Sequence, residues 1–395
     1  ISLDQDERVQ AVAHRHLGSD SRLTIVTMDG GAWLEANAAA RFDLIFADSW
    51  PGKFTHLDRA LGLLAPGGFY VVDDLKPQPT WPNGHGAAVE AFVATLAQQP
   101  NLTVSFLPWA SGVYNPGSNK ADADGFGAWR GRPVDVVVDW PSRYSWNDIV
   151  NPSWIYDAWA GTPYTKVLGV APIPEGDSSA TLATCASGAY NDKWRQFATN
   201  IKARGLDSTT VVRLGWEFNG NWYKWSAYSP SAFAGCWRQI VTSAESVAPA
   251  LRWDWNVNRG TGQSVADPRQ AYPGDAYVDF VGVDSYDGWP GATDEATWDQ
   301  HLNGAYGLKF WLDFATAHGK RLSVPEWGVY PGTAWAGHNG GDNPFYIQKM
   351  VGFFRANADR IAYESYFNED QSYYAGSLWN PVQAPKASAA YNSLY

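Results

Sequence analysis

Two glutamates stand where short apolar runs of the sequence end. Glu217 lies in the stretch VVRLGWEFNGNWYKW, residues 211–225, and Glu326 lies in RLSVPEWG, residues 321–328. A carboxyl group at the end of a buried strand, beside aromatic side chains, is placed to act on a sugar. Cleaving a glycosidic bond needs such a pair, because one acid protonates the leaving oxygen while the other meets the charge at the sugar carbon. The two glutamates are therefore the candidate catalytic residues, although each alone also fits a surface or salt-bridged acid.

The surroundings of the two acids predict different roles. Aromatic neighbours should partly desolvate Glu217, and Glu326 should add a nearby negative charge, and both effects raise a carboxyl pKa. We expect Glu217 to act first as general acid and then as general base. Glu326 must stay ionised to attack the anomeric carbon and so needs donors. Tyr286 is expected to donate a hydrogen bond to it, and Arg213 to supply a positive field.

The elements that must position these acids are the strands of a barrel. From about residue 112 onward the sequence alternates apolar runs with amphipathic segments, which predicts a C-terminal (β/α)8 TIM barrel within an α/β protein. The expected strands are 111–114, 134–140, 166–173, 210–216, 252–257, 278–285, 322–325 and 360–367. The expected crossover helices include 192–204, 231–247, 298–318 and 344–357.

Residues at the carboxyl ends of barrel strands face the active site, and this rule selects further candidates. The expected substrate-binding residues are Trp140, Arg213, Trp216, Asn219, Trp222, Trp225, Tyr286, Trp289, Trp327 and Asn368. The strand ends also carry Glu175, Asn256, Asn258, Asp284, Asp287, Glu369 and Asp370. Carboxylates on strands four and seven can approach to about 5–5.5 Å, the separation that gives retention of configuration. Such chemistry needs no metal, and we expect no cofactor.

Residues 1–112 form a separate α/β pattern. The runs 23–29, 42–49 and 68–74 predict parallel strands buried on both faces, and helices are expected at 6–17, 53–64 and 87–98. The turn Pro66-Gly67-Gly68 is expected to close the second helix. Residues 107–114 fit either the last strand of this part or the first of the barrel. We place the boundary near residue 112, which predicts domains at 1–112 and 113–395.

Charge and hydropathy exclude two classes of partner. The net charge is −11, whereas nucleic-acid binding needs clustered Lys and Arg. No stretch of about 18 uninterrupted apolar residues is present, so no membrane span is expected. Of the 22 Trp residues only Trp33, Trp50 and Trp81 precede residue 108. Flat aromatic rings stack on sugars, although many of these Trp side chains are expected in the core.

The two cysteines do not by themselves decide the cellular compartment of the protein. Cys185 and Cys236 could form one disulfide in an oxidising compartment or remain two buried thiols. No basic, apolar leader follows Ile1 in this sequence. The expected localisation is secreted or extracellular, and the oligomeric state is open.

A resemblance to a known family covers part of the N-terminal pattern. FDLIFADSWPGKFTHLDRALGLLAPGGFYVVDDL, residues 42–75, resembles class I S-adenosylmethionine-dependent O-methyltransferases. The resemblance implies a partial Rossmann-like domain in which Asp4 meets the cofactor ribose and Asp29 lies near the adenine. The family's first strand and Gly-rich loop should precede Ile1, and without that loop the ligand lacks its backbone donors. We therefore expect a truncated, inactive methyltransferase-like domain whose two aspartates cap helices or lie in solvated loops.

A second resemblance covers roughly residues 111–395. VRLGWEFNGNWYKW, VDFVGVDSYDG and RLSVPEWG resemble three strands of clan A glycoside hydrolases, and within them of family 26. The resemblance implies Glu217 as acid/base, Glu326 as nucleophile and Tyr286 as the partner of the nucleophile. Trp216 departs from the pattern, since the family usually has His there. Because that position normally meets the sugar, the exchange leaves the sugar and the linkage open.

The expected function is that of a retaining endo-β-glycanase acting on a β-mannan-type or related polysaccharide, such as β-1,3-xylan. One alternative is a barrel that binds glycans without cleaving them. The other is methyl transfer by residues 1–112, which S-adenosylmethionine binding would reveal.

Overall fold

The computed structural model describes residues 1–73, 75, 84–97, 99, 102 and 109–395. The chain divides into two compact units, Ile1–Phe106 and Leu107–Tyr395, which we describe separately. The sequence predictions made for residues 74, 81, 98 and 107–108 lie outside the described residues. The domain boundary near residue 112 stays a prediction.

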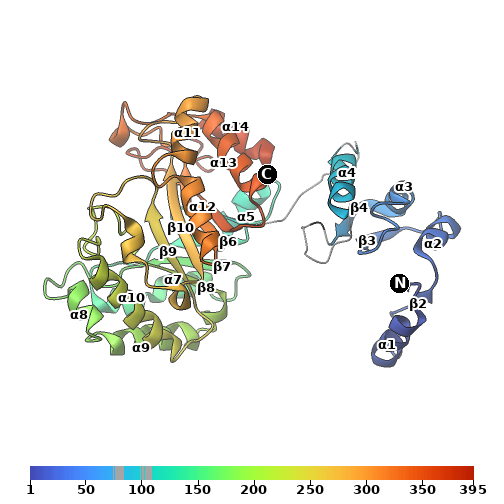
Figure 1. Ribbon diagram of the computed structural model, residues 1–395, viewed down its shortest axis with the longest axis horizontal. Coiled ribbons are helices and arrows are strands. Elements are labelled where there is room, and N and C mark those ends of the chain that lie inside the picture. The colour runs from blue at the N-terminus through green and yellow to red at the C-terminus, as the bar shows by residue number, and fades with distance from the viewer. Residues whose placement is uncertain (74, 76–83, 98, 100–101, 103–108) are drawn as a thin grey trace. The chain divides into compact units, whose positions relative to one another are not determined.

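Eight parallel strands within residues 109–395 close into a barrel, as the sequence predicted (Figure 1). Strand β5 pairs with β12 and with β6, which places the strand of the ambiguous 107–114 stretch in the barrel. The strands are β5 (Ala110–Tyr114), β6 (Val136–Asp139), β7 (Thr165–Val170), β8 (Thr210–Leu214), β9 (Arg252–Asn258), β10 (Phe280–Tyr286), β11 (Arg321–Gly328) and β12 (Ile361–Phe367).

Several barrel strands carry apolar runs because both of their faces are covered. Val136, Val167 and Val211 point into a cluster inside the barrel. Their neighbours Val137 and Val212 join the larger cluster with the surrounding helices. Successive side chains of a strand point to opposite faces, so a run of valines fills both layers at once.

Helices cover the outside of the barrel. They are α5 (Lys120–Trp129), α6 (Trp146–Val150), α7 (Ser153–Trp159), α8 (Leu182–Ala186), α9 (Asn191–Ala203), α10 (Pro230–Glu245), α11 (Glu295–Asn303), α12 (Leu308–Ala317), α13 (Pro344–Ala356) and α14 (Pro385–Leu394). The single helix expected at 298–318 is wrong, because α11 and α12 are separate. Gly304 and Gly307 both have extended backbone and break the helical path between them.

A disulfide joins α8 to α10, which lie side by side in Figure 1. It links Cys185 and Cys236 across 51 residues of sequence. The alternative of two buried thiols is therefore wrong.

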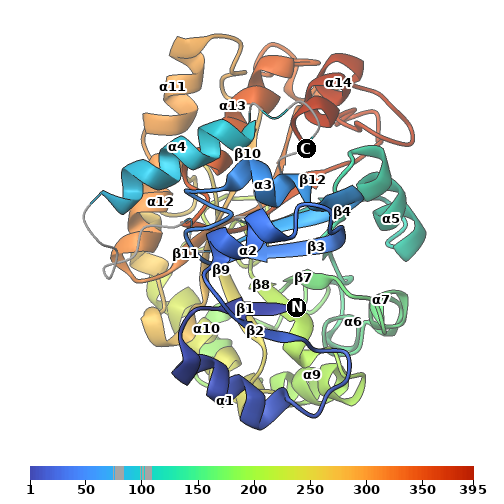
Figure 2. The same cartoon turned by 90° about the vertical axis from the view of Figure 1, so that its right-hand side faces the viewer.

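The N-terminal unit contains two pairs of parallel strands, each with a crossover helix. β1 (Ser2–Asp4) pairs with β2 (Ile25–Thr27), and β3 (Phe42–Ala47) pairs with β4 (Leu64–Val72), as Figure 2 shows for the second pair. The helices are α1 (Glu7–Leu17), α2 (Gly30–Ala36), α3 (Leu57–Gly62) and α4 (His85–Ala97). In the described residues the strands form two separate two-stranded sheets, so one continuous Rossmann-like sheet is not shown.

Two predictions for this unit are wrong. The strands were expected to be buried on both faces, but Leu44 and Phe46 of β3 and Phe69 of β4 are exposed, because only the opposite face packs on the core. The turn Pro66–Gly68 was expected to close a helix. It lies inside β4 instead, and α3 already ends at Gly62.

Within the described part of the chain, the helices are too short or too polar to cross a membrane.

Candidate active site

Glu217 lies in a tight turn just beyond the end of β8. The strand stops at Leu214, before the acid. The prediction that Glu217 lies on the strand itself is therefore wrong. Gly215 and Glu217 both have left-handed backbone, with φ of 57° and 50°. The turn is fixed because the Glu217 backbone N–H donates to the Asn256 carbonyl at 3.1 Å. A left-handed residue other than glycine is costly and is often found at functional sites.

The carboxyl group of Glu217 is buried and held by two donors. Asn258 Nδ2 donates to Oε1 at 2.6 Å, and Trp222 Nε1 donates to Oε2 at 3.0 Å. Burial, followed by the negative charge of Glu326, raises the pKa of Glu217 to about 7. A carboxylic acid that keeps its proton near neutral pH is suited to be a general acid.

Glu326 lies on β11 and accepts hydrogen bonds on both oxygens. Arg213 Nη1 donates to Oε1 at 2.8 Å, and the Tyr286 hydroxyl donates to Oε2 at 2.7 Å. The predicted hydrogen bond from Tyr286 is therefore confirmed. Two donors, one of them positively charged, thus fix both oxygens of this side chain in place.

Arg213 is fully buried and links Glu326 to the barrel interior. Its Nη2 donates to Asp284 Oδ2 at 2.7 Å and to Asn256 Oδ1 at 3.0 Å. Burial disfavours the charged guanidinium, but Asp284 and then Glu326 outweigh this effect and raise the pKa of Arg213. The positive field predicted from sequence is thus a permanent charge, fixed in orientation by an aspartate and an asparagine.

Aromatic rings surround the acids at the ends of neighbouring strands. Trp140, which follows β6, lies edge-on to Tyr114 and Phe367, with ring centroids 4.8 and 5.6 Å away. The Arg213 guanidinium lies 5.9 Å from the Trp140 ring. Sequence reasoning missed Tyr114 and Phe367, although an aromatic residue closing the first and last barrel strands was a readable signal.

Two of the predicted tryptophans present rings to solvent at this end of the barrel. Trp222 is 46% exposed and Trp289 is 60% exposed. Trp222 also contacts the acid directly through its N–H. These two rings are therefore accessible to a ligand, and their role as sugar contacts stays a prediction.

The other three tryptophan candidates lie in the protein interior, which corrects their assignment as direct sugar contacts. Trp216 is 2% exposed and donates to the Tyr223 hydroxyl, and Trp225 donates to the Trp216 carbonyl. Trp327 is fully buried and donates to Glu364. Their rings pack against other side chains, so they support the walls of the site.

The two asparagine candidates are buried as well. Asn219 donates to the Asn258 carbonyl at 2.8 Å and accepts from the Asn258 backbone N–H at 2.8 Å. It therefore positions the residue that donates to Glu217. Asn368 accepts from the Leu378 backbone N–H at 2.7 Å and so fixes the loop after β12. Both act on the site through other residues, which corrects their assignment as substrate contacts.

Asp4 and Asp29 of the N-terminal unit both satisfy backbone N–H groups. Asp29 caps α2 by accepting from the Ala32 N–H at 2.9 Å. Asp4 accepts from the Asp6 N–H at 2.8 Å, at the start of α1. Capping was the role expected for them without a cofactor.

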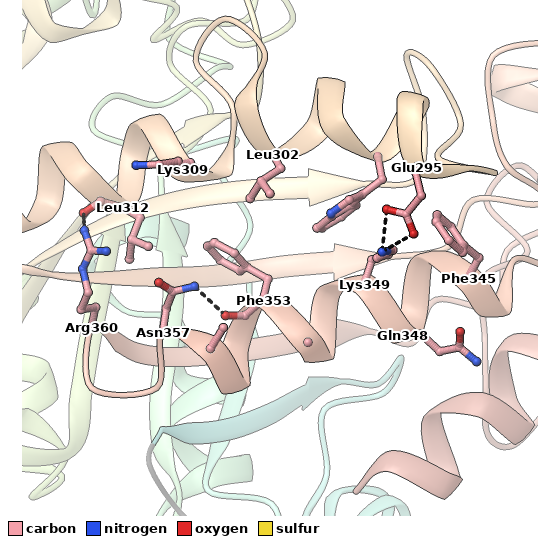
Figure 3. Close-up of a pocket in the computed structure, with 13 residues that line it drawn as sticks. Glu295, Leu302, Lys309, Leu312, Phe345, Gln348, Lys349, Phe353, Asn357 and Arg360 are labelled. Carbon is pink, nitrogen blue, oxygen red and sulfur yellow. Dashed lines mark hydrogen bonds and ion pairs between the residues drawn. The ribbon is translucent and has the colours of Figure 1, made fainter. Parts of the chain in front are cut away.

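A pocket of about 640 Å³ lies on the outer surface of the barrel, between α11, α12 and α13 (Figure 3). Phe353 and Leu302 line it, and an ion pair of Lys349 with Glu295 stands at one side. None of the candidate active-site residues lines this pocket. Among the described residues, no group of three or more His, Cys, Asp or Glu side chains is arranged to hold a metal ion.

Part of the barrel sequence matches a known family model. The sequence model of glycosyl hydrolase family 26 matches residues 164–344, a range that includes both candidate acids. Endoglucanase H of Acetivibrio thermocellus is 25% identical over 278 residues, 66% of this chain and 27% of the relative. A mannan endo-1,4-beta-mannosidase of Bifidobacterium adolescentis is 30% identical over 151 residues, 36% of this chain and 15% of the relative. The chain thus spans less than a third of each of these relatives.

Solved structures share the fold. A Cellulomonas fimi endo-beta-1,4-mannanase double mutant matches 72% of this chain and 70% of its own, with a TM-score of 0.52 and 19% identity. The catalytic domain of a Bacillus sp. JAMB-750 endo-beta-1,4-mannanase matches 76% of this chain and 88% of its own, with a TM-score of 0.50 and 17% identity. At these identities the likeness shows the shared barrel fold alone.

Proposed function

We propose that the barrel is a retaining endo-β-glycanase that hydrolyses a β-mannan-type polysaccharide by double displacement. One observation carries the proposal. A buried carboxylic acid with a raised pKa, Glu217, interacts electrostatically with a second carboxylate, Glu326, that holds two hydrogen-bond donors. One acid is suited to give a proton and the other to attack, as glycoside hydrolysis requires.

In the first step an oxygen of Glu326 attacks the anomeric carbon. The bond from that carbon to the leaving oxygen breaks, and Glu217 gives its proton to this oxygen, so that the aglycone leaves as an alcohol. Arg213 and Tyr286 orient the attacking carboxylate. Both donors are already in place before substrate binds, so the step requires little reorganisation.

In the second step Glu217, now ionised, takes a proton from a water molecule. The water oxygen attacks the anomeric carbon from the side that the aglycone left, and the ester bond to Glu326 breaks. Two inversions give net retention. Glu217 regains its proton and Glu326 its charge, so the enzyme returns to its starting state.

The choice of a mannan-type substrate rests on the family match and on relatives described as mannanases. A β-1,3-xylan remains the alternative substrate. Trp216 stands where the family usually has a sugar-contacting His, and its ring is buried. A screen of β-mannans, β-xylans and mixed-linkage glucans for reducing-end release decides between the substrates.

Replacement of the acids tests the mechanism. Glu217→Ala and Glu326→Ala should each lower hydrolysis of the best substrate by several orders of magnitude, on the order of 10³-fold or more. Azide should restore activity to the variant that lacks the acid/base when the substrate has an activated leaving group, because that substrate needs no proton. Wild-type-like rates in either variant would exclude the proposal. Tight oligosaccharide binding by the wild-type protein without any product would favour a glycan-binding barrel instead.

For the N-terminal unit we propose a methyltransferase-like α/β fold without methyl transfer activity. The two parallel strand pairs with their crossover helices support the α/β part of this proposal. Asp29 is occupied as a helix cap, which supports the lack of a cofactor role. Titration of S-adenosylmethionine into the protein should produce no binding heat, and saturable binding would contradict the assignment.

We also propose that the protein is secreted. The disulfide between Cys185 and Cys236 supports this, because such bonds persist in oxidising compartments. Alkylation of protein taken directly from its native source should modify neither cysteine.

A further inference from the structure

The segment Asp287–Ala292 directly follows β10, whose last residue, Tyr286, donates to the nucleophile. It carries Trp289, the most exposed of the candidate aromatic residues. An apolar ring exposed to solvent does not stabilise the fold by burial. If other residues nevertheless fix the loop that carries it, the ring is held in place for another purpose.

Two side chains from other elements hold the backbone on either side of Trp289. Arg259, which follows β9, donates from Nη2 to the Gly288 carbonyl at 2.8 Å. His301 of α11 lies with Nε2 2.6 Å from the Pro290 carbonyl. His301 is fully buried. The carbonyl groups before and after the exposed ring thus both receive hydrogen bonds from the protein interior.

The C-terminal end of the segment, at Ala292, is also held by hydrogen bonds to buried side chains. Asp287 accepts from the Ala292 N–H at 2.7 Å and from Asn343 Nδ2 at 2.8 Å. Asn343 Nδ2 also lies 2.7 Å from the Ala292 carbonyl. Asp287 and Asn343 are both buried, so these bonds are shielded from water. They close the segment into a fixed loop.

Among the described residues, the aromatic ring that stacks on Trp289 is that of His338. The centroid of the Trp289 ring lies 3.7 Å from that of His338, with the planes 12° apart, and the Trp289 backbone N–H donates to the His338 carbonyl at 2.8 Å. Trp289 is nevertheless 60% exposed. An imidazole thus stacks on the ring while more than half of the side chain is exposed, which suits a platform for the apolar face of a sugar.

We propose that Arg259 and His301 are positioning residues that hold Trp289 as a stacking platform for a sugar unit beyond the cleavage point. The inference rests on the proposed glycanase function and deepens it. A platform fixed in advance binds one more unit of an extended chain without the cost of ordering a loop. The subsite therefore favours long β-glycans over short ones.

The chemistry of His301 fits this task. Burial, followed by the charge of Arg259, lowers the pKa of His301 to about 3. The ring is then neutral at working pH and carries one proton. With that proton on Nε2 it donates to the Pro290 carbonyl, and Nδ1 has no hydrogen-bond donor among the described residues. A permanently neutral donor keeps the loop in place across the pH range of the enzyme.

Steady-state kinetics on soluble galactomannan test the proposal. Arg259→Ala and His301→Ala should each raise KM by about 5-fold with a smaller change in kcat, because they remove binding rather than chemistry. His301→Gln keeps an N–H donor and should recover part of the loss. His318→Ala, a histidine on the outer surface paired with Asp275, is the matched control and should leave KM unchanged.

A double-mutant cycle separates positioning from general stability. If His301 acts through Trp289, His301→Ala should add little to the KM of Trp289→Ala, since the platform is already lost. The proposal would be overturned if His301→Ala raised KM by the same factor in the wild-type protein and in the Trp289→Ala variant. It would also be overturned if Trp289→Ala left KM unchanged.

The same variants can be compared by affinity electrophoresis through galactomannan, which measures binding to the polymer. Each protein then also carries Glu217→Ala to prevent hydrolysis during the run. Retardation should weaken in the Trp289→Ala and His301→Ala forms by similar factors. If wild-type protein is retarded but does not hydrolyse the polymer, the proposed function fails while the platform is still tested by this gel. Equal retardation of all forms would overturn the platform even in an active enzyme.

Discussion

Arg213 donates from Nη1 to Oε1 of Glu326 at 2.8 Å, and both side chains are closed off from solvent. The other terminal nitrogen of Arg213 is held by Asp284 at 2.7 Å. An arginine fixed at both ends cannot turn away from the carboxylate it serves. The Glu326 side chain is thus held by the barrel interior rather than by the solvent.

Arg213→Lys should lower kcat by about 10²-fold, because lysine keeps the charge but not the fork that bonds Asp284 and Glu326 together. The measurement is kcat on the best β-glycan, with circular dichroism as a check on folding. A folded variant with a kcat near that of wild type would show that the charge alone suffices and that the fork is not needed.

The rate should fall as the pH rises through about 7, because Glu217 must be protonated to act as the acid. Trp222 donates to the ionised form of this carboxyl group and so lowers its pKa. Trp222→Phe removes the donor, and the alkaline limb of kcat should move to higher pH. A limb that moves to lower pH would contradict the role given to the indole N–H.

Glu217 should also affect stability with a defined sign. Its folded pKa of about 7 lies above the ordinary value of 4.5, so the folded state binds more protons and loses relative stability as the pH rises between these values. Glu217→Gln should therefore stabilise the protein at pH 8 by up to about 3 kcal/mol, and much less at pH 4. Thermal melting at the two pH values measures this, and an equal effect at both would count against a raised pKa.

The sequence predicted the strands of the barrel closely, because several of them contain runs of apolar residues that fill two layers at once. It also placed Glu217 and Glu326 at one end of the barrel, because parallel strands bring their carboxyl ends together. The hydrogen bond from Tyr286 followed from the same rule.

Side-chain direction was harder to predict. Trp216 is next to the acid in sequence and Trp225 follows in the same stretch, yet the rings of both are buried. The predicted helix at 298–318 failed because periodicity continues across glycines that break the backbone. The role of Arg259 could not be predicted from its neighbours in the sequence, since it donates to a carbonyl group 29 residues away.

The stereochemistry of the first product tests the central claim most directly. Proton NMR of a fresh β-linked oligosaccharide digest should show the β-anomer of the new reducing sugar first, with the α-anomer growing only by mutarotation. That result requires two displacements through Glu326 and Glu217. An initial α-anomer would mean a single displacement by water, and would contradict the role of Glu326 as nucleophile.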